Sequence, residues 1–239
     1  TSSPSRKLTD LFYTTIPWEK VAETCGGIRI ADIGCGNGKY SKYFREICNT
    51  RYPFYYTGVD QRTHPDWNLW DSNYATFELA SSCDAMSVVR EDTNVIITTS
   101  ALEHFQEDVS FFETVKIFVK KAVHPVLQIH VVPSKVCLWL YGVHGVRQYT
   151  PATIHKLFGL FSEEDEKVLY YLGGSNCNKL HFSQITFPLK CRLGDLRYKN
   201  TEKYESRLKK AVSKDLKILK GAPSYLAFVI NSNSSVNLF

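Results

Sequence analysis

The sequence contains no apolar run that approaches the roughly 20 consecutive residues needed to span a bilayer. Its first ten residues, TSSPSRKLTD, also lack the apolar segment of a secretory signal. The seven cysteines are an odd number and include no CxxC pair, which argues against a disulfide scaffold and favours reduced thiols. These absences predict a cytoplasmic protein without a membrane span.

No internal repeat and no low-complexity tract occurs. With 239 residues, of which 44% are hydrophobic and 22% charged, the chain can bury a core and is expected to form one domain over residues 1–239. Residues 1–10 are polar and are expected to form a flexible N-terminus, and residues 231–239, NSNSSVNLF, a loose tail.

The formal net charge of +5 is small, but it is unevenly distributed. Residues 190–220 hold eleven Lys and Arg against four Asp and Glu, a local excess of seven positive charges. Such a segment is usually the solvated face of a helix. The alternative is that it attracts a phosphate-bearing partner.

Strand-like and helix-like segments alternate along the chain. The β-rich runs are residues 28–33, 54–60, 95–99, 126–132 and 225–230. The helix-like stretches are residues 39–48, 109–123, 150–161 and 201–220. Strands that alternate with helices imply a mostly parallel sheet covered on both faces, so the sequence predicts a doubly wound α/β fold.

A glycine-rich turn, DIGCGNG, joins the first strand to the first of these helices. Its glycines, Gly34, Gly36 and Gly38, are suited to positive φ and to close approach of a ligand to the backbone. The spacing departs from the G-x-G-x-x-G of dinucleotide sites, and Asp32 stands at the end of the strand. A pyrophosphate prefers bare N–H groups, whereas a carboxylate favours a ligand that carries positive charge, as S-adenosylmethionine does.

The turn and the segments after it resemble the class I S-adenosylmethionine-dependent methyltransferases over about residues 28–160. The resemblance implies a Rossmann-like, mostly parallel seven-stranded sheet that binds S-adenosyl-L-methionine. It also implies an insertion before the last strand, at about residues 173–222, on the substrate side.

The resemblance assigns cofactor contacts to four segments in order. The glycine turn would hold the methionyl part, the acidic residue in GVDQ the ribose, the segment CDAMSV the adenine, and TTSALEHF the underside of the cofactor. The place of Asp60, about 20 residues beyond the turn, also fits ribose recognition by a carboxylate. The cofactor-binding residues implied are Asp32, Gly34, Cys35, Gly36, Gly38, Asp60, Gln61, Asp84, Ala85 and Ser100.

Two features depart from the family pattern. The usual L-x-P-G-G turn before the fifth strand is replaced by VKKAVHPVL, and the segment between the two acidic residues is rich in Trp and Asn. There Trp67, Trp70 and Tyr74 are expected to pack helix against sheet, with covering of the adenine as the alternative.

Transfer of a methyl group to an alcohol or amine also requires removal of a proton, so a general base is expected. His104 is the first candidate, because it lies beside the expected cofactor loop and titrates near neutral pH. Glu103, His144 and His130 are the further candidates, and Arg147 is suited to grip an acidic group of the substrate. Loop packing or helix capping is the alternative role for these residues.

Metal binding is not predicted, because Cys177, His181 and Cys191 do not form paired ligand motifs. The leading hypothesis is a methyltransferase that acts on oxygen of a small molecule or sugar, loosely similar to bacterial methyltransferases of surface-polysaccharide biosynthesis. The alternative is an RNA (tRNA) methyltransferase that uses the basic residues 190–220. A cofactor-binding scaffold without catalysis is the third hypothesis. The oligomeric state stays open.

Overall fold

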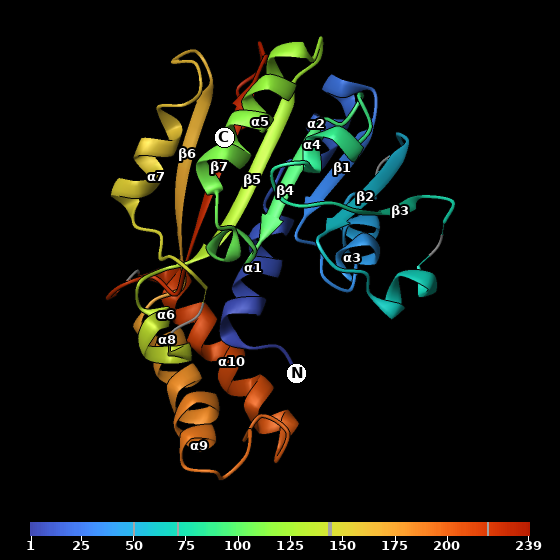
Figure 1. The fold of residues 1–239 in the computed structure, drawn as a ribbon. Helices are drawn as coiled ribbons and strands as arrows, with labels where there is room; N and C mark the ends of the chain where they lie inside the picture. The colour runs from blue at the N-terminus through green and yellow to red at the C-terminus, as the bar shows by residue number, and fades with distance from the viewer. Residues whose placement is uncertain (50, 71, 143–144, 219) are drawn as a thin grey trace.

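The computed structural model describes residues 1–49, 51–70, 72–142, 145–218 and 220–239. Within these residues one sheet contains seven strands in the order β3-β2-β1-β4-β5-β7-β6 (Figure 1). The strands are β1 (Ile28–Ile33), β2 (Phe54–Asp60), β3 (Ala75–Leu79), β4 (Val95–Thr99), β5 (Val126–Pro133), β6 (Glu166–Leu172) and β7 (Tyr225–Ser232). Strand β7 runs antiparallel to β5 and β6, and the other neighbouring strands are parallel. The predicted, mostly parallel α/β sheet is confirmed.

Helices lie on both faces of the sheet and beyond one of its edges (Figure 1). They are α1 (Pro4–Thr14), α2 (Trp18–Cys25), α3 (Tyr40–Ile47), α4 (Ala85–Val88), α5 (Asp108–Lys121), α6 (Cys137–Tyr141), α7 (Pro151–Phe158), α8 (Ser175–His181), α9 (Phe187–Lys190) and α10 (Thr201–Lys217). Shorter turns are the 3₁₀ helices η1 (Pro65–Leu69) and η2 (Leu102–His104) and the π-helix η3 (Phe182–Thr186). None of the helices in the described ranges is long and apolar enough to cross a membrane.

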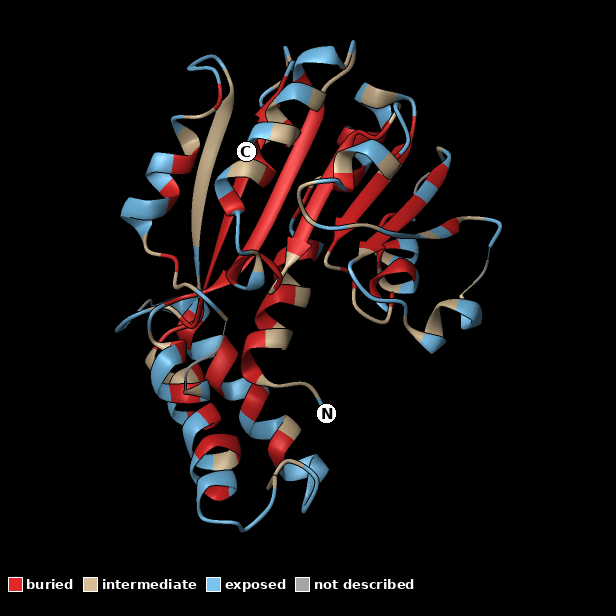
Figure 2. Ribbon diagram, in the orientation of Figure 1, coloured by how far each residue is buried: buried red, intermediate tan, exposed pale blue. Residues whose placement is uncertain are grey.

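Each face of the sheet has its own apolar core, which explains the near-continuous apolar runs in its strands. Every residue of β5 and β7 is buried. Side chains from α1, α2 and α3, such as Tyr13 and Phe44, fill the core on one face. Side chains from α4, α5 and α7, such as Phe112 and Leu157, fill the other. Figure 2 shows the central strands buried, the edge strand β6 intermediate and the outward helix surfaces exposed.

Residues 173–224 lie between β6 and β7 and form α8, η3, α9 and α10. Their helices pack on one another through a third apolar cluster, which includes Leu180 and Leu208 and takes in Leu8 of α1. The buried carboxylate of Asp215 accepts a hydrogen bond of 2.8 Å from the backbone N–H of Cys177 and so fixes the start of α8 on α10. In Figure 1 these helices extend past the ends of the strands, at the bottom of the view.

The sequence predicts a flexible segment at residues 1–10, whereas the structure has a helix there. Helix α1 begins in this segment, and the Ser3 hydroxyl caps it by accepting a hydrogen bond of 3.2 Å from the N–H of Arg6. Leu8 and Phe12, four residues apart on one face of the helix, are buried. The polar residues around them, such as Thr9 and Asp10, concealed this apolar face in the sequence.

The C-terminus is also held more firmly than the sequence predicts. Residues 231 and 232 continue strand β7. The N–H groups of Leu238 and Phe239 each donate a hydrogen bond of 2.9 Å to the Glu166 carboxylate. The tail therefore packs along the edge strand β6.

The contact of α1 with the helices between β6 and β7 is tested by Leu8→Ala. This side chain is 3% exposed, and its truncation is expected to lower the free energy of unfolding by about 2–5 kcal/mol. The exposed Thr14→Ala on the same helix is the control and should change it by about 0.5 kcal/mol or less. Urea denaturation measures both variants, and equal small changes would mean that the N-terminus does not pack as described.

Candidate functional site

The glycine turn follows β1 and requires glycine at two places for steric reasons. Gly34 and Gly38 have φ of +80° and +75°. A Cβ at Gly34 would lie 2.5 Å from the Cβ of Ala101, and one at Gly38 would lie 2.4 Å from Cε1 of Phe77. At Gly36, by contrast, nothing lies within 4 Å of the Cβ position, so the middle of the turn is open. The turn is thus packed tightly at both ends and accessible at its centre.

The end of β2 holds the turn in place. The backbone N–H of Gly36 donates a hydrogen bond of 2.9 Å to Oδ2 of Asp60, and the N–H of Gly34 donates one of 2.8 Å to the carbonyl of Val59. The other oxygen of Asp60 accepts a bond of 3.1 Å from the N–H of Arg62. Two of the predicted site residues, Asp60 and Gly36, are therefore in direct contact.

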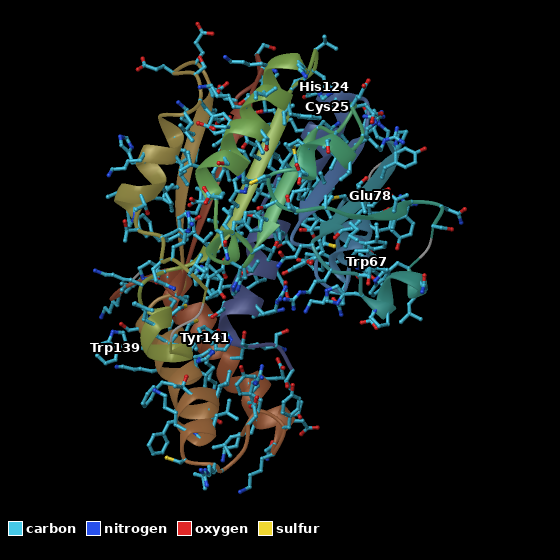
Figure 3. The ribbon with its side chains drawn as sticks, in the orientation of Figure 1. Cys25, Trp67, Glu78, His124, Trp139 and Tyr141 are labelled. Atoms are coloured by element: carbon cyan, nitrogen blue, oxygen red, sulfur yellow. The ribbon has the colours of Figure 1, made fainter. Side chains whose placement is uncertain are left out.

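Two tryptophans support the turn from outside. The indole N–H of Trp67, which is labelled in Figure 3, donates a hydrogen bond of 2.8 Å to the carbonyl of Gly36. The indole N–H of Trp70 donates one of 2.7 Å to the carbonyl of Asn37. Trp67 also stacks on Phe77 with ring centroids 5.2 Å apart. The sequence analysis considered that these residues pack helix against sheet or cover the adenine, and it did not predict hydrogen bonds to the turn.

Three adjoining hollows surround the turn. The large hollow has a volume of about 550 Å³, and its walls include Gly34, Asp60, Gln61, Ser100 and His104. The turn hollow, of about 180 Å³, is lined by Arg6, Asp32, Gly34, Cys35, Gly36, Asn37, Lys39, Tyr40 and Thr99. The hydroxyl hollow, of about 160 Å³, is lined by Ser3, Arg6, Thr9, Thr99, Ser100, Tyr141 and Tyr225. Neighbouring hollows share wall residues and therefore adjoin one another.

Asp32 is the buried acid of this site. Its side chain is 1% exposed, and its Oδ2 accepts a hydrogen bond of 2.5 Å from the hydroxyl of Tyr56. Its Oδ1 has no hydrogen-bond partner among the described residues. Burial raises the pKa of Asp32 to about 7, despite the opposing effect of the Tyr56 hydrogen bond. A cation that reached Oδ1 would restore the ionised form.

Ser100 begins the loop after β4 and touches two hollows. It has a left-handed φ of +52°, which is unusual for a residue with a Cβ and is a form of backbone strain often found at functional sites. Its N–H donates 2.8 Å to the carbonyl of Val131, and its hydroxyl donates 3.2 Å to the hydroxyl of Tyr225. The neighbouring Thr99 hydroxyl lies 2.6 Å from that of Tyr13, so α1 is tied to the same loop.

Asp84 and Ala85 lie outside the walls of the large hollow. Asp84 is exposed and accepts a hydrogen bond of 2.6 Å from the hydroxyl of Ser81, and Ala85 is buried in the core beneath α4. The hollow is instead lined by the residues just before them, Ser81, Ser82 and Cys83. The two residues that the resemblance assigns to the adenine therefore do not line this hollow.

The predicted base candidates occupy different environments. His104 is exposed at the large hollow, whereas Glu103 is buried and lines none of the three hollows. Burial raises the pKa of Glu103 to about 7. His144 lies outside the described residues. His130 is buried among aromatic rings and bonded to the Thr98 hydroxyl at 2.9 Å, and burial lowers its pKa to about 3, so it is not placed to act as a base.

Arg147 forms an ion pair with Asp108 and donates a hydrogen bond to the carbonyl of Gln106. It therefore fastens two loops together and is not directed at a substrate.

Two wall residues of the hydroxyl hollow were not expected from the sequence. Arg6 comes from the N-terminal helix, and Tyr225 opens the last strand.

The described residues contain no group of three His, Cys, Asp or Glu side chains arranged to hold a metal ion. Of the three residues weighed in the sequence for zinc, Cys177 is buried in the cluster of α8 and α10, and Cys191 is exposed. The ring of His181 packs edge-on against Tyr141, and its Nδ1 bonds the Thr186 hydroxyl at 3.0 Å.

No family model matches the chain, and neither does any curated protein. Among solved structures, the chain is similar to the plantazolicin methyltransferase BamL in complex with a triazolic desmethylPZN analog and SAH. The two are 15% identical over 95% of this chain and 85% of that one, with a TM-score of 0.59.

Two further solved structures are similar over most of their length. A SAM-dependent methyltransferase from Archaeoglobus fulgidus is 12% identical over 93% of this chain and 94% of that one, with a TM-score of 0.54. One from Mesorhizobium loti is 14% identical over 87% and 92%, with a TM-score of 0.52. This chain therefore has the class I fold of the S-adenosylmethionine-dependent methyltransferases, as the glycine turn predicted.

Proposed function

We propose that the protein is an S-adenosylmethionine-dependent methyltransferase. The observation that carries the proposal is Asp32, a residue in the wall of the turn hollow whose buried Oδ1 has no hydrogen-bond partner among the described residues. A buried acceptor without a partner is costly unless a ligand satisfies it. The ammonium group of a methionyl ligand is a cation of the required kind.

The remaining walls fit the other parts of such a donor. Asp60 lines the large hollow, and each of its oxygens has capacity for a ribose hydroxyl beyond the backbone bond it already accepts. The volume of about 550 Å³ lies within the roughly 300–1,000 Å³ typical of small-molecule sites. Ser81, Ser82 and Cys83 supply small side chains at the far wall, where a planar base has room.

The bound donor supplies an electrophilic methyl group on a sulfonium. The protein aligns the donor and excludes water. The glycine turn, held between Asp60 and the two tryptophans, fixes the position of the methionyl part. Helix α1 shields the site through Arg6, whose Nη1 donates 2.5 Å to the hydroxyl of Tyr40 at the start of α3.

We further propose that the acceptor is a small molecule and that methylation occurs on oxygen. The hydroxyl hollow adjoins the donor site and is small and polar, which supports this choice. The proposal also assigns residues 173–222, the helices before the last strand, to the substrate side. His104 stays a sequence prediction as a base, since it lines the hollow on the donor side.

The RNA alternative gains no specific support from α10. Its Tyr204, Leu208 and Val212 point into the third cluster, and its basic side chains are exposed. That arrangement is what a solvated helix face requires. A sugar acceptor, a role in polysaccharide biosynthesis and a cytoplasmic location stay predictions from the sequence.

Asp60→Ala is expected to weaken binding of S-adenosylhomocysteine by about 10–100-fold, because a carboxylate that accepts hydrogen bonds is worth about 1.5–3 kcal/mol. Asp84→Ala is the matched control, since this predicted contact lies outside the hollow, and it should change the affinity less than about 2-fold. Calorimetric titration of the intact protein measures both. Failure of the unaltered protein to bind would overturn the proposed function, and an equal loss in Asp84→Ala would contradict the described geometry.

The pKa of Asp32 predicts a pH dependence of donor binding. Its folded-state pKa lies near 7, above the usual 3.8, so the carboxyl is largely neutral below pH 7 and ionised above it. A cationic ligand prefers the ionised form, so affinity for S-adenosylhomocysteine should fall about 10-fold per pH unit below 7 and level off above it.

Asp32→Asn removes the titrating group and should flatten the affinity profile between pH 5.5 and 8.5. Calorimetry in buffers of different ionisation enthalpy should also show proton release on binding at pH 6 to the unaltered protein only. A profile for the unaltered protein as flat as that of the variant would contradict this role of Asp32.

A further inference from the structure

The hydroxyl hollow borders the place where the two halves of the donor site meet. It shares Arg6 and Thr99 with the turn hollow and Ser100 with the large hollow. If the methionyl part lies in the turn hollow and the adenosine part in the large hollow, the sulfur that joins them lies near Gly34, which both hollows share. The hydroxyl hollow adjoins both of these hollows. An acceptor in the hydroxyl hollow therefore faces the methyl group. This inference rests on the proposed function.

The walls of the hydroxyl hollow are rich in hydrogen-bond donors. Six of its lining side chains carry hydroxyl groups, and the seventh is the guanidinium of Arg6. Burial, with smaller effects of Tyr141 and Cys137, holds the pKa of Tyr225 well above its usual range, so this phenol keeps its proton and can donate it. The Tyr225 oxygen already accepts the hydrogen bond from Ser100.

Arg6 brings a positive charge to the hollow, and the Asp10 carboxylate is linked to it through the hydroxyl of Tyr40. Its Nη1 donates to Tyr40, and its Cζ lies 5.0 Å from the centre of that ring. Among the described residues Arg6 forms no ion pair within 4.0 Å. Most of its five N–H donors are thus available to an anion.

No carboxylate, imidazole or amine lines the hollow within the described part of the chain. An alcohol or amine acceptor would need such a base to take its proton. A carboxylate already carries the negative charge that the reaction requires. It would also accept hydrogen bonds from the Arg6 guanidinium and the Tyr225 hydroxyl.

We propose that the hydroxyl hollow is the acceptor subsite for a small carboxylic acid and that the product is its methyl ester. A carboxylate oxygen forms a bond to the methyl carbon as the carbon–sulfur bond breaks. The electron pair goes to sulfur, which becomes a neutral thioether, and no proton leaves the acceptor. The volume of about 160 Å³, below that of sites for drug-sized ligands, limits the part of the acceptor that enters to a compact group.

The binding test uses the full chain saturated with S-adenosylhomocysteine and titrated with benzoate and hexanoate. At least one should bind saturably, whereas benzyl alcohol and 1-hexanol should bind at least 10-fold more weakly. Arg6→Gln should weaken carboxylate binding by about 10–100-fold, as expected for a charged hydrogen bond. Tyr225→Phe should weaken it by about 3–10-fold. Lys7→Gln, one residue from Arg6 and outside the hollow, is the matched control and should leave it unchanged.

Equal binding of acids and alcohols, failure of both acids to bind, or an unchanged affinity in Arg6→Gln would overturn the inference. If the protein binds S-adenosylhomocysteine but not the acids, only the inference about the acceptor fails, and the proposed function is not contradicted. Loss of that binding in the unaltered protein defeats the proposed function itself. The two failures are therefore distinguishable.

The chemical test follows the methyl group. The protein is incubated with methyl-labelled S-adenosylmethionine and a low-molecular-mass extract of its source cells, and the labelled product is treated with alkali. Methyl esters release labelled methanol, whereas methyl ethers and methylamines retain the label. Release of methanol supports the proposal, and an alkali-stable label overturns it while leaving methyl transfer intact.

Discussion

The site depends on the hydrogen bond from the Gly36 N–H to the Asp60 carboxylate. It joins the turn after β1 to the end of β2, the neighbouring parallel strand, and so makes one rigid wall from two segments. The indoles of Trp67 and Trp70 hold the carbonyls on the other side of the same turn. With its backbone groups bonded in this way, the turn keeps three left-handed glycines in place and leaves Gly36 open to a ligand.

The second organising feature is the concentration of function at one edge of the sheet. Parallel strands bring the ends of β1, β2 and β4 together there, as in other open α/β folds. Helix α1 reaches the same edge from the N-terminus and contributes Arg6, and the last strand contributes Tyr225. The donor side is built from adjacent strands, whereas the hydroxyl hollow combines segments from the two ends of the chain. Because of this division, the glycine motif says little about the proposed acceptor.

The sequence predicted the parts that depend on local pattern. The bounds of β1 and β2 follow directly from their apolar runs. The cofactor roles of Asp32 and Asp60 stay predictions from the resemblance. The sequence missed what depends on distant contacts. Helix α1 has an apolar face of few residues that becomes evident only when Leu8 meets the helices before β7.

The same limit applies to single side chains. From the sequence, His130 is a candidate base. In the fold it is a core residue that packs between aromatic rings. Asp84 matches a motif, but the chain turns so that Ser81, Ser82 and Cys83 face the hollow instead. Periodicity does not specify which residue of a loop points inward, because that depends on how the loop packs.

The most direct test of the account is a crystal structure of the protein with S-adenosylhomocysteine. The account predicts the amino group of the ligand within hydrogen-bond distance of Oδ1 of Asp32 and its ribose hydroxyls on Asp60. Its sulfur should lie near Gly34, beside the hydroxyl hollow. A ligand bound with its amino group away from Asp32, or with its sulfur remote from that hollow, would contradict the account.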